Sequence, residues 1–174
     1  MEATAGFTLF ETAVGACAVS WGDAGLTGVW LPSESAESTR RAVLRRHPHA
    51  TEQPPPTEVA DAVDGITRLL AGEDVDLRDV TLDLRDVPEF VQRVYAVARS
   101  LPCGVTMTYG EMAARAGEPG AAQAVGQVMA GNPFPVVVPC HRVVAAGGGN
   151  GGFSAPGGVD TKLRLLAIEG ATLF

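Results

Sequence analysis

The sequence lacks the features that would tie the chain to a membrane, a disulfide framework or a zinc site. Its longest apolar runs fall far short of the roughly 18 residues that a membrane span needs. Its N-terminus, MEATAGFTLFE, is acidic and has no basic stretch followed by an apolar one, so we expect no signal peptide. Three cysteines are too few, and odd in number, for a disulfide scaffold. The three histidines come with no Cys-x-x-Cys pair, so no zinc pattern is present. We therefore expect a protein of the reducing cytoplasm.

Positive charge is also scarce. The chain has 13 Lys and Arg against 20 Asp and Glu, a net charge of −7. That balance argues against a strongly basic protein that binds nucleic acid mainly through its phosphates. The excess is uneven, because residues 1–85 hold 7 Arg and 14 acidic residues, whereas residues 86–174 hold 6 of each sign. The neutral second half leaves weak binding to nucleic acid open.

The length and composition indicate a folded protein of one domain or two small ones. The chain has 174 residues, of which 46% are hydrophobic and 19% charged. A chain this apolar is not intrinsically disordered, and it is long enough to bury a core. No internal repeat is visible.

The first half, residues 1–85, has the pattern of a small α/β domain. Alternation of Cys17, Val19 and Trp21 with small residues predicts a strand, and Gly22-Asp23 predicts a turn after it. The segment Gln53-Pro54-Pro55-Pro56 separates two helical patterns. The expected elements are β structure over 7–31 with its second strand at 26–31, helices at 33–46 and 57–70, and an edge strand at 75–84.

The second half, residues 86–174, is predicted to be mostly helical. One helix should begin near Pro88, which suits a first turn. The capping-box spacing at Thr108-Tyr109-Gly110-Glu111 predicts a helix over 109–117. A further helix should start at Pro119, and the two short helices make a helix-turn-helix candidate. Asp160 is expected to cap a last helix that ends at Glu169-Gly170.

Cys140 and His141 are adjacent and suggest nucleophilic chemistry. A thiolate is the reactive form of cysteine, and a nearby base or positive charge favours it. His141 could supply the base, and Glu169, at the end of the last helix, could orient that histidine. The alternative is a buried, inert cysteine within an apolar β-run. Adjacency in sequence does not decide between the two.

A longer string carries a family resemblance. Pro139-Cys140-His141-Arg142-Val143-Val144, preceded by Gly131-Asn132-Pro133 and by Thr108-Tyr109-Gly110-Glu111, resembles the O6-alkylguanine-DNA alkyltransferases over residues 88–170. The resemblance implies an N-terminal, ribonuclease-H-like α/β domain over 1–85. It also implies a mostly α, winged-helix-like C-terminal domain over 86–174 that contains the helix-turn-helix.

The resemblance also implies a function. Members of the family flip an alkylated base out of duplex DNA and transfer the alkyl group irreversibly from O6 of guanine, or O4 of thymine, to a cysteine. Here that cysteine would be Cys140, and each molecule would act once, without cofactor or metal. The expected partner is duplex DNA with alkylated bases, bound weakly by a monomer.

Catalytic roles follow from the resemblance position by position. His141 would take the Cys140 proton through a water, and Glu169 would orient His141. Asn132 would hydrogen-bond the turn before the active-site segment. Tyr109 would lie beside the flipped base and help to protonate the leaving guanine.

Substrate contacts follow in the same way. Ser154 would approach O6 with its hydroxyl or amide, and the carbonyls of Cys140 and Val143 would accept from the guanine amino group. The expected substrate-binding set is Tyr109, Gln123, Gly131, Val143, Phe153 and Ser154.

The chain departs from the family pattern at its DNA-facing helix and at its glycine-rich loop, 147–158. Gln123 stands where the family has an arginine that fills the space of the flipped base, and residues 119–130 contain no Lys or Arg. Phe153 replaces a tyrosine, and Ala155-Pro156 is a two-residue insertion. These departures leave two alternatives: an alkyl acceptor for a small-molecule donor other than DNA, and a non-catalytic protein that binds lesions. The second is disfavoured because Cys140 is present.

Overall fold

The chain divides into two compact units, residues 1–86 and 87–174. A computed structural model describes residues 4–148 and 152–171. The tip of the glycine-rich loop predicted from the sequence, 149–151, lies outside the described residues.

The first unit is built on a mixed sheet. Its strand order is β3-β2-β1-β4, with antiparallel pairing of β1 with β2 and of β2 with β3, and parallel pairing of β1 with β4. The strands are β1 (Gly6–Thr12), β2 (Gly15–Gly22), β3 (Gly25–Trp30) and β4 (Thr51–Glu52).

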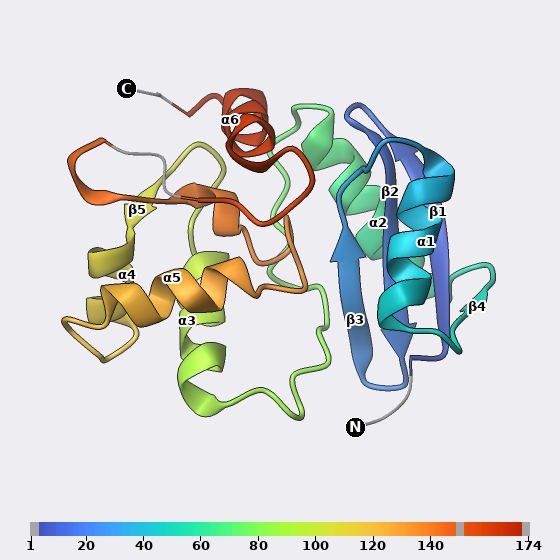
Figure 1. Cartoon of the computed structure of the whole chain (residues 1–174), viewed down its shortest axis with the longest axis horizontal. Helices are drawn as coiled ribbons and strands as arrows, with labels where there is room; N and C mark the ends of the chain where they lie inside the picture. The colour runs from blue at the N-terminus through green and yellow to red at the C-terminus, as the bar shows by residue number, and fades with distance from the viewer. Residues whose placement is uncertain (1–3, 149–151, 172–174) are drawn as a thin grey trace. The chain divides into compact units, whose positions relative to one another are not determined.

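Helices cover both faces of this sheet. In Figure 1, α1 (Ala36–Arg46) is drawn in front of the strands and α2 (Thr57–Leu70) behind them, and both helices contact the sheet. Consecutive side chains of a strand point to opposite faces, and Cys17 and Ala18 of β2 are both fully buried. Both halves of the alternating pattern in β2 are therefore core, as a sheet covered on two faces requires.

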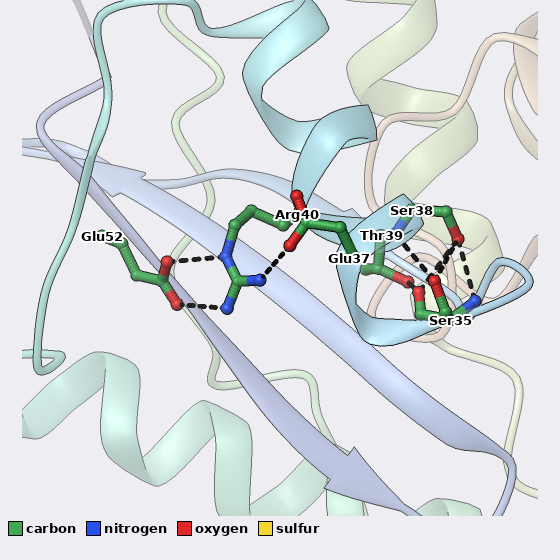
Figure 2. A network of polar contacts seen from close by, with 6 residues as sticks. All are labelled: Ser35, Glu37, Ser38, Thr39, Arg40 and Glu52. Carbon is green, nitrogen blue, oxygen red and sulfur yellow. Dashed lines mark hydrogen bonds and ion pairs between the residues drawn. The ribbon is translucent and has the colours of Figure 1, made fainter.

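The start of α1 is fixed by a capping box and by one buried hydroxyl. The Ser35 hydroxyl oxygen accepts from the Ser38 backbone amide, and the Ser38 hydroxyl oxygen accepts from the Ser35 backbone amide (Figure 2). The hydroxyl of Thr39, which is 1% exposed, donates to Ala16 O on β2 and accepts from Ser33 N. This hydroxyl therefore ties the first turn of α1 to the sheet.

An ion-pair network joins the next turn of α1 to β4. The Arg40 guanidinium binds both carboxylate oxygens of Glu52 and one oxygen of Glu37 (Figure 2). These side chains are solvent-exposed to a third or more, so the network adds little to stability by itself.

The β structure predicted over 7–31 is confirmed but was incomplete, and the strand predicted over 75–84 was wrong. Residues 7–31 form three strands, because the chain already reverses between Thr12 and Gly15. Residues 75–84 form no strand, and only an isolated bridge between Leu82 and Leu26 remains. The Asp76 side chain accepts from the backbone amide of Arg78, and such local bonds compete with strand pairing.

The second unit is mostly helical, as predicted. Helices α4 and α5 lie side by side in Figure 1 and are joined by residues 116–121, so the helix-turn-helix arrangement is present. The elements are α3 (Glu89–Arg99), β5 (Met107–Thr108), α4 (Tyr109–Arg115), α5 (Ala122–Ala130), the 3-10 turns η1 (Cys140–Arg142) and η2 (Ala146–Gly148), β6 (Val143–Val144) and α6 (Gly158–Ile168).

One helix start in the second unit is set by a side-chain cap, and two are set by glycines with a positive φ. The capping box at Thr108 is present and starts α4, as predicted. Helix α5 begins at Ala122 and not at Pro119, because Gly120 has φ +87° and breaks the helical path. Helix α6 begins after Gly157, also at φ +87°, so Asp160 lies within its first turn and is not its cap.

No helix in the described parts of the chain is long and apolar enough to cross a membrane.

Replacement of Thr39 by valine tests the link between α1 and the sheet. Valine keeps the shape but leaves Ala16 O and Ser33 N without the hydroxyl, so we expect the free energy of unfolding to fall by about 2 kcal/mol. Chemical denaturation would measure the loss. Thr8→Val on β1 is the matched control, because the Thr8 hydroxyl makes a long 3.4 Å contact with its neighbour Leu9 O. If both variants lose the same stability, the Thr39 hydroxyl does not make this link.

Candidate active site

Cys140 opens a 3-10 turn and not a strand. Turn η1, Cys140–Arg142, follows the bend at Pro139, and Cys140 is 6% exposed. The interpretation of this cysteine as part of a β-run was therefore wrong for its backbone. The turn presents consecutive residues in different directions, so Cys140 and His141 belong to different contacts.

Asn132 fastens the segment before Cys140. Its side-chain amide donates to Val138 O at 2.8 Å, and its side-chain oxygen accepts from Phe134 N at 2.9 Å. The enclosed turn contains Val136 at φ +75°, a left-handed conformation that is costly for a β-branched residue. The two Asn132 bonds hold this turn in place. The same side chain also hydrogen-bonds the Cys140 thiol, so it connects the end of α5 to the nucleophile.

His141 and Glu169 form a buried pair. His141 Nε2 lies 2.8 Å from Glu169 Oε1, and the two side chains are 0% and 2% exposed. Glu169 directly follows α6, and main-chain bonding continues through it to Leu165 O. Helix α6 therefore delivers the carboxylate to the turn that carries Cys140.

Arg142 fixes the other side of Glu169. Its guanidinium contacts both carboxylate oxygens of Glu169, donates to Leu101 O at 2.6 Å and approaches Cys103 Sγ at 3.3 Å. Burial alone would raise the pKa of Glu169, but the bonds from Arg142 and His141 outweigh it and hold that pKa at about 2. Glu169 is thus a carboxylate at neutral pH.

An ionised Glu169 settles the tautomer of His141. A carboxylate only accepts, so Nε2 must carry the proton of this hydrogen bond. Burial lowers the pKa of His141 more than the Glu169 carboxylate raises it, so the ring is neutral near pH 7. Its Nδ1 is then a lone-pair acceptor. That atom is buried and has no protein partner within the described ranges.

Lys162 is a further buried charge near the thiol. This residue of α6 is 0% exposed, and its Nζ donates to Val143 O at 2.6 Å and to Gly152 O at 3.4 Å. It also lies 5.9 Å from the centre of the Tyr109 ring. Burial lowers the pKa of Lys162 to about 8. Lys162 precedes Glu169 by about two helical turns, so the two residues share one face at the C-terminal end of the chain, a spacing that is visible in the sequence.

The Cys140 thiol sits between opposing influences. Burial raises its pKa, whereas the hydrogen bond with Asn132 and the positive charge of Lys162 lower it. Burial prevails, so the resting group is the thiol. A base must therefore remove the proton before the sulfur can attack a substrate.

A cavity of about 440 Å³ opens onto Cys140. Four of the residues predicted from the sequence line it together: Tyr109, Cys140, Phe153 and Ser154. The remaining lining comes from α5 and the loop, namely Gly126, Met129, Ala130 and Gly152. The cavity is of a size that suits a small-molecule ligand.

A second hollow, of about 600 Å³, lies along the exposed side of α5. Gln123 and Gln127 line it, and Tyr109 lines both this groove and the cavity at Cys140. Helix α5 carries no charge in its first or last turn. The groove therefore offers amide and small apolar side chains and no cation.

Three predicted substrate contacts lie outside the cavity lining. Gln123 lines the groove instead, Gly131 ends α5, and Val143 is fully buried. The Val143 carbonyl already accepts from Lys162, which leaves it one lone pair for a ligand. Asn132, predicted to hydrogen-bond the turn, makes two hydrogen bonds there and one with the Cys140 thiol. Among residues 4–148 and 152–171, no group of His, Cys, Asp and Glu side chains could hold a metal ion.

A Glu169→Gln variant tests the buried ion pair. Glutamine removes the negative charge of Glu169 and leaves the buried Arg142 guanidinium without an ion-pair partner, so we expect the free energy of unfolding to fall by about 3 kcal/mol at neutral pH. The pKa of Glu169 is depressed from 4.5 to about 2, so its stabilisation is complete above pH 4.5 and disappears as the pH falls toward 2. The difference between variant and wild type should shrink across that interval.

The control is Glu89→Gln, because Glu89 pairs with Arg93 but is 89% exposed. We expect it to change the unfolding free energy by less than about 0.5 kcal/mol at any pH. A Glu169→Gln difference that did not depend on pH would contradict the ionised pair.

Comparison with known proteins agrees with this geometry. The family model of the 6-O-methylguanine DNA methyltransferase DNA binding domain matches residues 89–171. A methylated-DNA–protein-cysteine methyltransferase of Methanothermobacter thermautotrophicus is 37% identical over 155 residues, which are 89% of this chain and 80% of that protein. The corresponding protein of Mycolicibacterium paratuberculosis is 45% identical over 114 residues, 66% of this chain and 67% of its own length.

Solved structures resemble both units. The crystal structure of Mycobacterium tuberculosis OGT in complex with DNA is 33% identical and superposes with a TM-score of 0.73 over 94% of this chain and 92% of that one. The O6-methylguanine-DNA methyltransferase of the archaeon Pyrococcus kodakaraensis is 26% identical, with a TM-score of 0.75 over 95% of this chain and 99% of that one. The fold class expected from the sequence, an α/β N-terminal unit followed by a mostly α C-terminal domain, is confirmed, with a mixed sheet in the first unit. The chain belongs to the methylated-DNA–protein-cysteine methyltransferase family.

Proposed function

We propose that the chain repairs alkylated DNA by taking a methyl or other alkyl group from O6 of guanine, or O4 of thymine, onto Cys140. The observation that carries the proposal is the arrangement at the cavity floor. A buried thiol faces a space of about 440 Å³. Its neighbour in sequence is a neutral histidine held in one tautomer by a carboxylate. The family membership supplies the reaction class.

The reaction balances without a cofactor. The Cys140 proton passes to His141 Nδ1 through a bridging water, and Glu169 stabilises the resulting imidazolium. The sulfur then forms a bond to the alkyl carbon while the bond from that carbon to O6 breaks. The electron pair of the broken bond goes to the guanine, which takes up a proton. The product is a thioether on Cys140 and an unmodified base, so each molecule acts once.

Tyr109 and Ser154 are the groups that would face the leaving base. Both line the cavity with Cys140, and the Tyr109 ring lies near the Lys162 ammonium. Burial raises the pKa of Tyr109, so its hydroxyl keeps its proton and can donate it toward the guanine. The Ser154 hydroxyl or amide can donate to O6. Donors opposite the thiolate favour departure of the purine.

Helix α5 would meet the duplex. Its small side chains permit a close approach to a shallow groove, and Gln123 is exposed where it can take the space of a flipped base. Tyr109 borders both the α5 groove and the cavity, so the two hollows are neighbours along one path for a flipped base. The absence of charge on α5 implies a weak grip with a shallow salt dependence. In this proposal the protein acts as a cytoplasmic monomer on duplex DNA.

A second candidate is an alkyl acceptor for a small-molecule donor. It is favoured by Gln123 and by the net charge of −7, since both weaken attraction to phosphates. A non-catalytic lesion binder is the weaker alternative, because such a protein has no use for a thiol with a base beside it.

Mass spectrometry after exposure to alkylated DNA tests the proposal. Incubation with duplex carrying O6-methylguanine should add the mass of one methyl group in place of the Cys140 thiol proton. The Cys140→Ala variant should gain nothing but still bind the lesion. Cys17→Ala is the control and should react like wild type, since Cys17 lies in the sheet of the first unit and burial raises its pKa to about 11. Methylation by the free modified nucleobase alone, and never by duplex, would favour the second candidate. An unchanged mass with a reactive thiol would exclude both.

Gln123→Arg should strengthen action on DNA. A charged donor in the space of the flipped base should raise the second-order rate of methyl transfer from duplex by about tenfold. Gln127→Arg adds the same charge one turn along the same groove and should produce a smaller gain that salt removes. Rates would be measured by quenched-flow sampling and mass analysis. If neither variant changes the rate with duplex while the free nucleobase reacts at full speed, DNA is not the donor.

A further inference from the structure

The loop that walls the cavity is fastened at both ends to consecutive residues of α6. Gly152, Phe153 and Ser154 form this wall beside Cys140. At its start, Gly152 O accepts from Lys162 Nζ at 3.4 Å. Just past its end, Pro156 O accepts from the Thr161 hydroxyl at 2.5 Å. The wall is therefore held by two hydrogen bonds whose donors, Thr161 and Lys162, are consecutive residues of α6.

The Thr161 end of the wall is closely fitted. Gly157 lies directly against Thr161, because a Cβ on Gly157 would stand 2.1 Å from the Thr161 hydroxyl oxygen. The main chain there has φ +87° at Gly157 and +56° at Gly158, and Gly158 N donates back to Ala155 O at 3.0 Å. The acceptor of the Thr161 bond, Pro156, belongs to Ala155-Pro156, the pair that the family resemblance indicates as an insertion.

We infer that the Thr161–Pro156 clamp sets the distance of the wall from Cys140 and thereby selects the size of the alkyl group. The inference rests on the proposed function. A longer loop without an anchor would leave the wall free to move away from the thiol. The Thr161–Pro156 hydrogen bond holds residues 155–156 against α6, and Glu169, which hydrogen-bonds His141, directly follows the same helix. The wall and the base are then held by one rigid element, and bulky groups must displace the wall to reach the sulfur.

Thr161 is a positioning residue in this scheme, and Thr161→Val is the direct test. Duplexes that carry O6-methylguanine or O6-benzylguanine would be reacted with each protein, and the rates of Cys140 modification compared by intact mass. Valine removes the hydroxyl at nearly constant shape. We expect the benzyl-to-methyl rate ratio to rise about fivefold, the size of effect that loss of one hydrogen bond produces.

Two further variants make the result decisive. Thr161→Ser keeps the hydroxyl and should restore the wild-type ratio. In Gly157→Ala the added Cβ would clash with the Thr161 hydroxyl and displace it from Pro156 O, so this variant should raise the ratio as Thr161→Val does. Thermal denaturation would show that each variant is folded.

The possible outcomes separate this inference from the proposed function. If wild type accepts no alkyl group from either duplex, the proposed function fails. If wild type reacts but Thr161→Val slows both substrates equally or leaves the ratio within about twofold, the clamp does not select size and only the inference is lost. A ratio that falls would overturn the inference as well.

Discussion

The buried ion pair between Arg142 and Glu169 is the interaction on which the geometry of the site depends. Taking two charges out of water is costly, and the cost is repaid only when every donor and acceptor finds a partner. Here the guanidinium also binds Leu101 O, and the carboxylate also accepts from His141. The pair therefore holds the C-terminal end of α6 against the turn η1 and orients the His141 ring.

Helix α6 carries this constraint across the site. Lys162 and Glu169 lie on its buried side together with Leu165 and Leu166, which pack into the core. Lys162, near the start of the helix, places a cation near the thiol and donates to Gly152 O, while Glu169, just past its end, hydrogen-bonds the His141 ring. The resting state of Cys140 in these surroundings is the thiol. A nucleophile that rests as the thiol is less reactive toward other electrophiles, because the thiolate is the attacking form.

The sequence predicted the elements of the second unit best where local chemistry decides them. The capping box at Thr108 and the start of α3 after Pro88 are read directly from the residues. The starts of α5 and α6 were missed because Gly120 and Gly157 adopt left-handed backbones that no side-chain pattern announces. The strand expected at 75–84 failed for a similar reason, since the Asp76 side chain satisfies the backbone locally.

At the site, the sequence suggested Cys140 and His141 from the motif and Glu169 from the end of the last helix, but it could not show how these side chains are held. Arg142 stood within the motif with no role, because its partner lies at the far end of α6. Lys162 was overlooked because a lysine in a helix is usually exposed, and its burial is a property of the packing.

Nitrogen-15 NMR of the His141 ring would report its tautomer and its charge. With Glu169 ionised, His141 is neutral, with its proton on Nε2 and a lone pair on Nδ1. At neutral pH, the Nε2 signal should be that of a protonated nitrogen and the Nδ1 signal that of an unprotonated one. Glu169→Gln should mix the two tautomers. A doubly protonated ring, or a proton on Nδ1 in the wild type, would contradict the account.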